Sequence, residues 1–132
     1  MTKLNNFKKL HSSDDILLLP NVWDTGSARM FQKKGFRAVG TSSAAIAESL
    51  GCRDGEEVPF SELSEIVKRI CERTELMVSV DIEGGYSRDP DVICENVRRL
   101  TDLGVVGINI EDSVVSDDRR LLNADDFAKT VR

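Results

Sequence analysis

Two short runs of β-branched residues, each ending in carboxylates, most constrain what this chain can fold into. The first spans residues 78–86 (VSVDIEGGY) and the second spans residues 106–112 (VGINIED). Successive side chains of a strand point to opposite faces, so each run should be polar on one face and apolar on the other. The polar faces would carry Ser79, Asp81 and Glu83 in the first run, and Gly107, Asn109 and Glu111 in the second. The pattern therefore predicts two strands with acidic groups at their carboxyl ends.

The rest of the chain alternates strand patterns with helix patterns. The expected strands cover residues 16–19, 36–40, 77–82 and 105–110. A leader helix is expected over residues 1–11, and further helices over residues 25–34, 43–50, 61–72 and 90–103, and from 124 to 132, where the last is still running. Strands that recur about every thirty residues with helices between them are typical of right-handed βαβ units and a parallel sheet.

Polar residues on one face of the last two strands favour a barrel over an open sheet. The inner face of a barrel carries the active site at its carboxyl end, whereas both faces of a doubly wound sheet meet helices and should be apolar. A complete (β/α)₈ barrel needs about 200 residues, and this chain has 132. We therefore predict an α/β fold that is the N-terminal half of a (β/α)₈ TIM-type barrel. It would form one partial domain over residues 1–132, with the C-terminal half absent.

Charge and composition exclude several classes of partner. The formal net charge is −5, and the 18 Lys and Arg residues are scattered among the acids, so neither nucleic acid nor an anionic membrane is expected to bind. The longest apolar run, residues 16–20, is far too short to span a membrane, and residues 1–6 lack the apolar core of a signal peptide. The three cysteines are far apart and form no CxxC pair. We expect a cytoplasmic protein with reduced thiols.

Three carboxylates, Asp81, Glu83 and Glu111, would converge if the two acidic strands lie side by side. Clustered acids repel one another unless a cation lies among them, and no arginine or lysine accompanies them on these strands. Oxygen ligands favour a hard ion that keeps several waters, so Mg²⁺ is expected, with Mn²⁺ as the alternative. The other interpretation is that these acids merely face solvent. Gly84 and Gly85 argue against it, because glycines let the backbone approach a ligand.

Five motifs along the chain resemble one family. They are residues 20–29 (PNVWDTGSAR), 41–44 (TSSA), 50–56 (LGCRDGE), 81–86 (DIEGGY) and 107–112 (GINIED). In this order, over nearly the whole chain, they are similar to the isocitrate lyase and phosphoenolpyruvate mutase superfamily. The resemblance implies a (β/α)₈ barrel in which Mg²⁺ holds an α-oxo acid or its enolate. Members cleave isocitrate or methylisocitrate, split or rearrange phosphonopyruvate, or decarboxylate oxaloacetate.

The resemblance also implies roles for the acids. Asp81 would be the ligand closest to the ion, and Glu83 and Glu111 would hold the waters of the ion. Asp54 would be the catalytic acid near the substrate. The ion would stabilise the negative charge that grows on the oxo oxygen as an enolate forms.

Further residues are implied as substrate contacts. The backbone N–H groups of Ser42 and Ser43, at the start of a helix, would bind the substrate carboxylate. Trp23 and Asp24 belong to a substrate-proximal motif of the family, and Tyr86 would line the pocket. Packing and structural roles are the competing interpretations of Trp23 and Tyr86.

The chain departs from the family after the last expected strand. Isocitrate and methylisocitrate lyases carry a Lys-Lys/Arg-Cys-Gly-His loop there, and the mutases and phosphonopyruvate hydrolases carry a gate similar to Lys-Leu-Phe-Pro-Lys. Residues 112–122 (DSVVSDDRRLL) match neither. Ser113, Ser116 and Asp117 therefore have no assignable role, and cleavage of isocitrate or methylisocitrate is not expected.

Two functions stay open. The first is a Mg²⁺-dependent lyase or hydrolase of a small α-oxo acid or phosphonate, which breaks a carbon–carbon or carbon–phosphorus bond. The second is a catalytically silent half-barrel that assembles with another chain, because open sheet edges invite pairing. A homo-oligomer is compatible with either function, and the sequence does not decide whether the chain is an enzyme.

Overall fold

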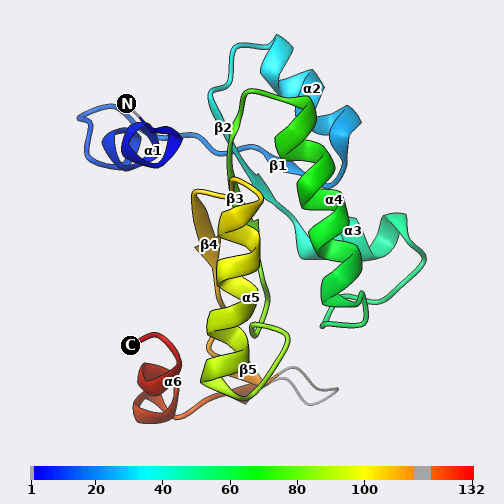
Figure 1. Cartoon of the computed structure of the whole chain (residues 1–132), viewed down its shortest axis with the longest axis vertical. Helices are drawn as coiled ribbons and strands as arrows, with labels where there is room; N and C mark the ends of the chain where they lie inside the picture. The colour runs from blue at the N-terminus through cyan, green and yellow to red at the C-terminus, as the bar shows by residue number, and fades with distance from the viewer. Residues whose placement is uncertain (1, 115–119) are drawn as a thin grey trace.

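Four parallel strands, paired in the order β1-β2-β3-β4, form the centre of the molecule (Figure 1). The computed structural model describes residues 2–114 and 120–132. The four strands are β1 (Asn21–Val22), β2 (Ala38–Thr41), β3 (Met77–Asp81) and β4 (Gly107–Asn109). The helices are α1 (Lys3–His11), α2 (Thr25–Lys33), α3 (Ser43–Ser49), α4 (Phe60–Arg73), α5 (Pro90–Asp102) and α6 (Ala124–Thr130). The predicted alternation of parallel strands and helices is confirmed.

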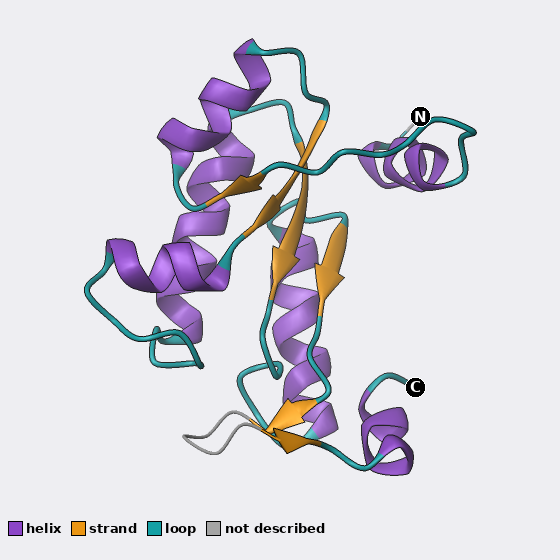
Figure 2. Cartoon of the chain, turned by 180° about the vertical axis from the view of Figure 1, so that it is seen from behind, coloured by secondary structure: helices purple, strands orange, loops and turns teal. Residues whose placement is uncertain are grey.

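One face of the sheet is apolar and packs against the helices. Figures 1 and 2 show α4 and α5 on the same side of the strands. Val39, Val78 and Val80 point into the core on this side and are fully buried. They meet Leu63, Val67 and Ile70 of α4, which recur at helical spacing, and Leu100 of α5. Burying side chains of this size contributes about 1.5–3 kcal/mol each, so this layer is the main source of stability.

The opposite face is small and polar, as the alternation predicts. Ser79 pairs in register with Gly40 on one side and with Gly107 on the other, and Asp81 pairs with Asn109. A Cβ on Gly107 would lie 2.8 Å from Cε1 of Phe7 and 3.0 Å from Oγ of Ser79. The leader helix α1 therefore packs its Phe7 ring against this face near the amino ends of β3 and β4.

Helix starts follow the capping residues of the sequence. The carboxylate of Asp24 accepts a hydrogen bond from the N–H of Ser27 and begins α2 in a capping box. Ser42, Asp89 and Asn123 begin α3, α5 and α6 in the same way, each by accepting from a backbone N–H. Gly35 lies just past α2 with a φ of 88°, which glycine adopts at little cost.

The first strand lies later in the chain than predicted. Residues 16–19 form no strand, and the side chains of Ile16 and Leu18 are 95% and 67% exposed. The strand is Asn21–Val22, inside the segment expected to be a loop, and Val22 is fully buried. An apolar run becomes a core strand only where its backbone meets a partner, and here β2 pairs with Asn21 and Val22.

Three smaller expectations are also corrected. The apolar spacing of residues 90–103 predicts Val92, Ile93 and Asn96 on the buried side of α5; Ile93 and Asn96 are buried, but Val92 is 44% exposed. The last helix ends at Thr130 and does not run to Arg132. The segment after β4 forms an unpredicted antiparallel pair, β5 (Ser113–Val114) with β6 (Arg120–Leu121). Ser116 and Asp117 lie outside the described residues. No helix in the described part of the chain is long and apolar enough to cross a membrane.

Candidate functional site

Asp81 ends β3 and is held there by three hydrogen bonds. Its Oδ2 accepts from the hydroxyl of Ser43 at 3.0 Å, and its Oδ1 accepts from the N–H of Glu83 at 3.0 Å. Its own N–H donates to Oγ1 of Thr41 at 2.9 Å. The carboxylate is thus held by the start of α3 and the turn after β3, and the backbone of Asp81 is held by the end of β2, at the carboxyl edge of the sheet.

The carboxyl ends of β3 and β4 run side by side, as predicted for the acidic strands. The N–H of Glu111 donates to the carbonyl of Glu83 at 2.7 Å, and the N–H of Ile82 donates to the carbonyl of Asn109 at 3.0 Å. The two glutamate backbones are therefore direct neighbours.

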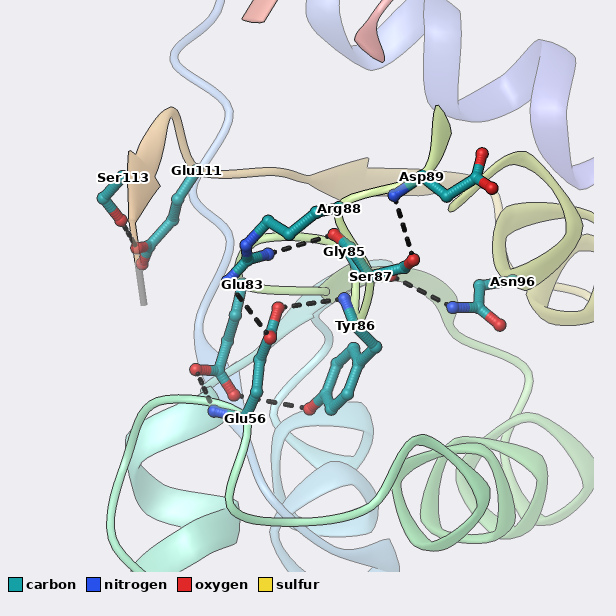
Figure 3. A network of polar contacts seen from close by, with 10 residues as sticks. All are labelled: Glu56, Glu83, Gly85, Tyr86, Ser87, Arg88, Asp89, Asn96, Glu111 and Ser113. Atoms are coloured by element: carbon teal, nitrogen blue, oxygen red, sulfur yellow. Dashed lines mark hydrogen bonds and ion pairs between the residues drawn. The ribbon is translucent and has the colours of Figure 1, made fainter. Parts of the chain in front are cut away.

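The side chains of these glutamates turn toward different partners (Figure 3). Oε2 of Glu83 accepts from the N–H of Glu56 at 2.8 Å, whereas Oε2 of Glu111 accepts from the hydroxyl of Ser113 at 2.6 Å. Across residues 2–114 and 120–132, no three Asp, Glu, His or Cys side chains lie close enough to hold one ion between them. The expected convergence thus holds for the strand ends but not for a three-carboxylate ligand set, because Glu83 takes a left-handed backbone conformation with a φ of 49°.

Glu83 is a buried acid with acidic neighbours. The side chain is 3% exposed, and burial raises the pKa of its carboxyl above the ordinary value. The charges of Asp54 and Glu56 raise this pKa further, against the hydrogen bond from the N–H of Glu56. Burial and the charge of Glu83 likewise raise the pKa of Tyr86 above its ordinary range. Glu83 is therefore a buried carboxyl with two further acidic groups, Asp54 and Glu56, close to it.

Replacing Glu83 by glutamine should stabilise the metal-free chain at neutral pH. Glutamine keeps an oxygen for the N–H of Glu56 and is never charged. A carboxyl whose pKa is higher in the folded than in the unfolded chain lowers the free energy of unfolding as the pH rises from the unfolded pKa through the folded pKa. The stability that Glu83→Gln gains over the wild type should therefore be absent below about pH 4.5 and grow above it. Thermal unfolding in EDTA at a series of pH values checks this. The control is Glu62→Gln, which changes an exposed glutamate in the first turn of α4. A wild type that is more stable than Glu83→Gln at neutral pH would contradict the prediction.

The predicted substrate contacts lie at the same edge of the sheet, in different local settings. The side chain of Ser42 caps α3, and the hydroxyl of Ser43 contacts Asp81. Trp23 and Asp24 follow β1, and both are exposed. Oδ1 of Asp24 accepts from the N–H and the hydroxyl of Ser27 at 2.7 and 2.8 Å, so this carboxylate already has a structural role. A role in binding substrate stays a prediction for all four residues.

Tyr86 and Asp54 both lie near Glu83. The hydroxyl of Tyr86 donates to Oε1 of Glu83 at 3.3 Å, and the Tyr86 ring packs against Phe60 with 5.5 Å between centroids. Asp54 is exposed in the loop between α3 and α4, near enough to Glu83 to raise its pKa. The catalytic role of Asp54 stays a prediction.

Three site residues were not predicted. Thr41 and Glu56 hold Asp81 and Glu83 through hydrogen bonds that span 40 and 27 residues of sequence. Ser113, which had no assignable role, is buried and contacts Glu111. The position of Ser113 two residues after a strand-end acid could have suggested its contact. Thr41 and Glu56 lie in the motifs of residues 41–44 and 50–56, but these motifs do not identify their distant partners.

The sequence of this chain matches known proteins over most of its length. Residues 7–132 match the family model described as phosphoenolpyruvate phosphomutase. An uncharacterized protein of Mycobacterium tuberculosis is 38% identical over 108 residues, which make up 82% of this chain and 40% of that protein.

Solved structures agree in fold. A Burkholderia cenocepacia protein assigned as a phosphonomutase superposes with a TM-score of 0.92 at 36% identity, covering 98% of this chain and 52% of that one. A phosphonopyruvate hydrolase in complex with oxalate and Mg²⁺ gives a TM-score of 0.92 at 18% identity, covering 99% and 46%. The chain therefore spans about half the length of these structures, or less, and its four βα units correspond to half of a TIM barrel. Since the family model matches almost the whole chain, the chain belongs to the phosphoenolpyruvate phosphomutase family.

Proposed function

We propose that this chain carries the metal-binding half of a Mg²⁺-dependent lyase or hydrolase of a small α-oxo acid. The bond broken would be a carbon–carbon or carbon–phosphorus bond next to the oxo group. The observation that carries the proposal is Asp81, a carboxylate fixed by Ser43 and by the N–H of Glu83 at the carboxyl edge of the sheet. In barrel enzymes this edge holds the catalytic groups.

The donor set fits a magnesium ion that keeps most of its waters. Mg²⁺ is commonly bound through one or two carboxylates plus water, so a cluster of three direct ligands is not required. Asp81 would be the direct ligand, and Glu83 and Glu111 would hold waters. When bound, the ion would supply positive charge opposite the oxo oxygen, where negative charge develops. The negative charge gathered around Glu83 supports this assignment, because a cation would relieve it.

The other site residues would bind and orient the substrate. Ser43 lies beside Asp81, so the backbone N–H of Ser43 could receive the substrate carboxylate. The N–H of Ser42, expected to share this role, donates instead to the carbonyl of Val22 at 3.1 Å. Asp54, in its exposed loop, would act as the acid or base. Trp23, Asp24 and Tyr86 would border the substrate. The phosphonopyruvate hydrolase neighbour was solved with oxalate and Mg²⁺, which supports a small dicarboxylate or oxo acid as the ligand class.

A titration of Mn²⁺ and Mg²⁺ into the folded chain, followed by oxalate, tests the proposal. We expect saturable metal binding and oxalate binding that requires the metal, both measured by calorimetry. A folded chain without any metal-dependent heat would remove the proposed site.

A second candidate function is assembly, and the open edges of the sheet favour it. Within the described residues, β1 pairs only with β2 and β4 only with β3. The side chains of Ile16 and Leu18, before β1, are largely exposed, and Ile108 in β4 is 36% exposed. Unpaired edges with apolar side chains favour pairing with another chain.

Assembly predicts that Ile108→Lys lowers the self-association of this chain, because a charged side chain on an edge strand opposes pairing. Sedimentation velocity over a range of concentrations should then show a wild-type dimer or larger species and a monomeric variant. Lys129→Ala, an exposed change on α6, is the control. A wild type that is monomeric at every concentration would contradict the assembly function.

A further inference from the structure

Three residues with left-handed backbone conformations meet in one hydrogen-bonded group beside the proposed metal site. Glu56, Glu83 and Tyr86 have φ values of 61°, 49° and 61°, and they are the non-glycine residues of the described chain with positive φ. Side chains disfavour this region, so such residues persist only where surrounding contacts hold them. Their coincidence in one group indicates that the two loops are built against each other.

Glu56 provides the contacts that join the loops (Figure 3). Its N–H donates to Oε2 of Glu83 at 2.8 Å, and its Oε1 accepts from the N–H of Tyr86 at 2.9 Å. The Tyr86 hydroxyl closes the ring by donating to Oε1 of Glu83 at 3.3 Å. Oε2 of Glu56 also pairs with Arg88 at 3.5 Å. One side chain from the α3–α4 loop thus contacts the turn after β3 at two points.

Helix α5 packs against the turn after β3. Asn96 donates from Nδ2 to the carbonyl of Gly85 at 3.0 Å, and both residues are buried. A Cβ at Gly85 would lie 2.9 Å from two carbons of Ile93, so the turn already touches the helix. The Phe60 ring packs against the Tyr86 ring, and among the residues that the structure describes, Glu56 makes the polar contacts between the loop that carries Asp54 and this turn.

We propose that Glu56 is a positioning residue: it orients Glu83 and Tyr86 and joins the loop that carries Asp54 to the carboxylate edge. The link to metal affinity rests on the proposed function, whereas the orientation of Tyr86 does not. Partners of ligating groups typically change metal affinity by about 10–100-fold when they are removed.

The test uses the single tyrosine of the chain. With 3-fluorotyrosine incorporated, ¹⁹F NMR reports on Tyr86 alone. The fluorine atom is next to the hydroxyl that contacts Glu83. Glu56→Ala should shift or broaden this resonance and weaken Mn²⁺ binding about 10-fold or more. Glu56→Gln keeps the oxygen that accepts from Tyr86 and should leave both close to wild type. Glu57→Ala removes the neighbouring carboxylate of the same loop, which contacts Arg53, and should also leave both unchanged.

Each outcome decides the proposal. An unshifted resonance in Glu56→Ala would overturn it, and so would a shifted resonance with unchanged Mn²⁺ affinity, because the contact would then be only structural. If the wild type binds no Mn²⁺, the proposed function fails, and the resonance in Glu56→Ala, compared with Glu56→Gln, still decides the orienting role. If Glu56→Ala does not fold, Glu56→Asp takes its place, since it keeps the charge but withdraws the acceptor by one methylene.

Discussion

Gly85→Ala is expected to lower the free energy of unfolding by about 2–5 kcal/mol. Two costs add. Gly85 has a φ of 94°, a region in which a Cβ costs roughly 1–2 kcal/mol. That Cβ would also lie 2.9 Å from Cγ1 and Cγ2 of Ile93, which is buried, and overpacking of this kind costs about 1–3 kcal/mol. Urea denaturation of the variant and the wild type measures the loss.

Gly104→Ala is a matched control for this prediction. Gly104 also has a φ of 94°, but no atom lies within 4 Å of a Cβ built on it. It should therefore show only the backbone cost, about 1–2 kcal/mol. If both variants lose the same free energy of unfolding, the Ile93 side chain moves aside, and the turn is not packed against α5 as described.

How much of this could be predicted from the sequence depends on whether each feature is local. The alternation in residues 77–82 placed β3 correctly, because the two faces of a strand follow from the order of neighbouring residues. Helix starts were equally local, since a cap such as Asp24 contacts an N–H only three residues away. The apolar spacing of Leu63, Val67 and Ile70 identified the buried side of α4 for the same reason.

Features that depend on distant partners were missed. Ile16 to Leu19 read as a buried strand, but burial requires a second element, and β2 pairs with the next segment instead. Glu56 ends the motif of residues 50–56, but the motif does not identify its contacts, because its partners Glu83 and Tyr86 lie 27 and 30 residues away. The directions of Glu83 and Glu111 were also beyond alternation, since the strands have ended and a positive φ redirects Glu83.

Asp81→Ala is expected to weaken binding of Mn²⁺ more than about 100-fold. Removal of an outer partner of a ligand already costs about 10–100-fold, and Asp81 is the proposed direct ligand. The variant also leaves the Ser43 hydroxyl and the Glu83 N–H without their acceptor. Calorimetric or EPR titration of Mn²⁺ at neutral pH measures the change.

Two further variants separate charge from shape in this experiment. Asp81→Asn keeps an oxygen for the N–H of Glu83 but removes the charge, so it should fold like the wild type and still lose most of the Mn²⁺ affinity. Asp102→Asn removes one charge from the end of α5, at an exposed position, and should bind Mn²⁺ as the wild type does. If Asp81→Asn keeps full affinity, the ion is held elsewhere and Asp81 only joins β2, α3 and the turn after β3. If Asp81→Asn and Asp102→Asn lose affinity equally, binding depends on net charge alone, and the carboxyl edge of the sheet has no specific site.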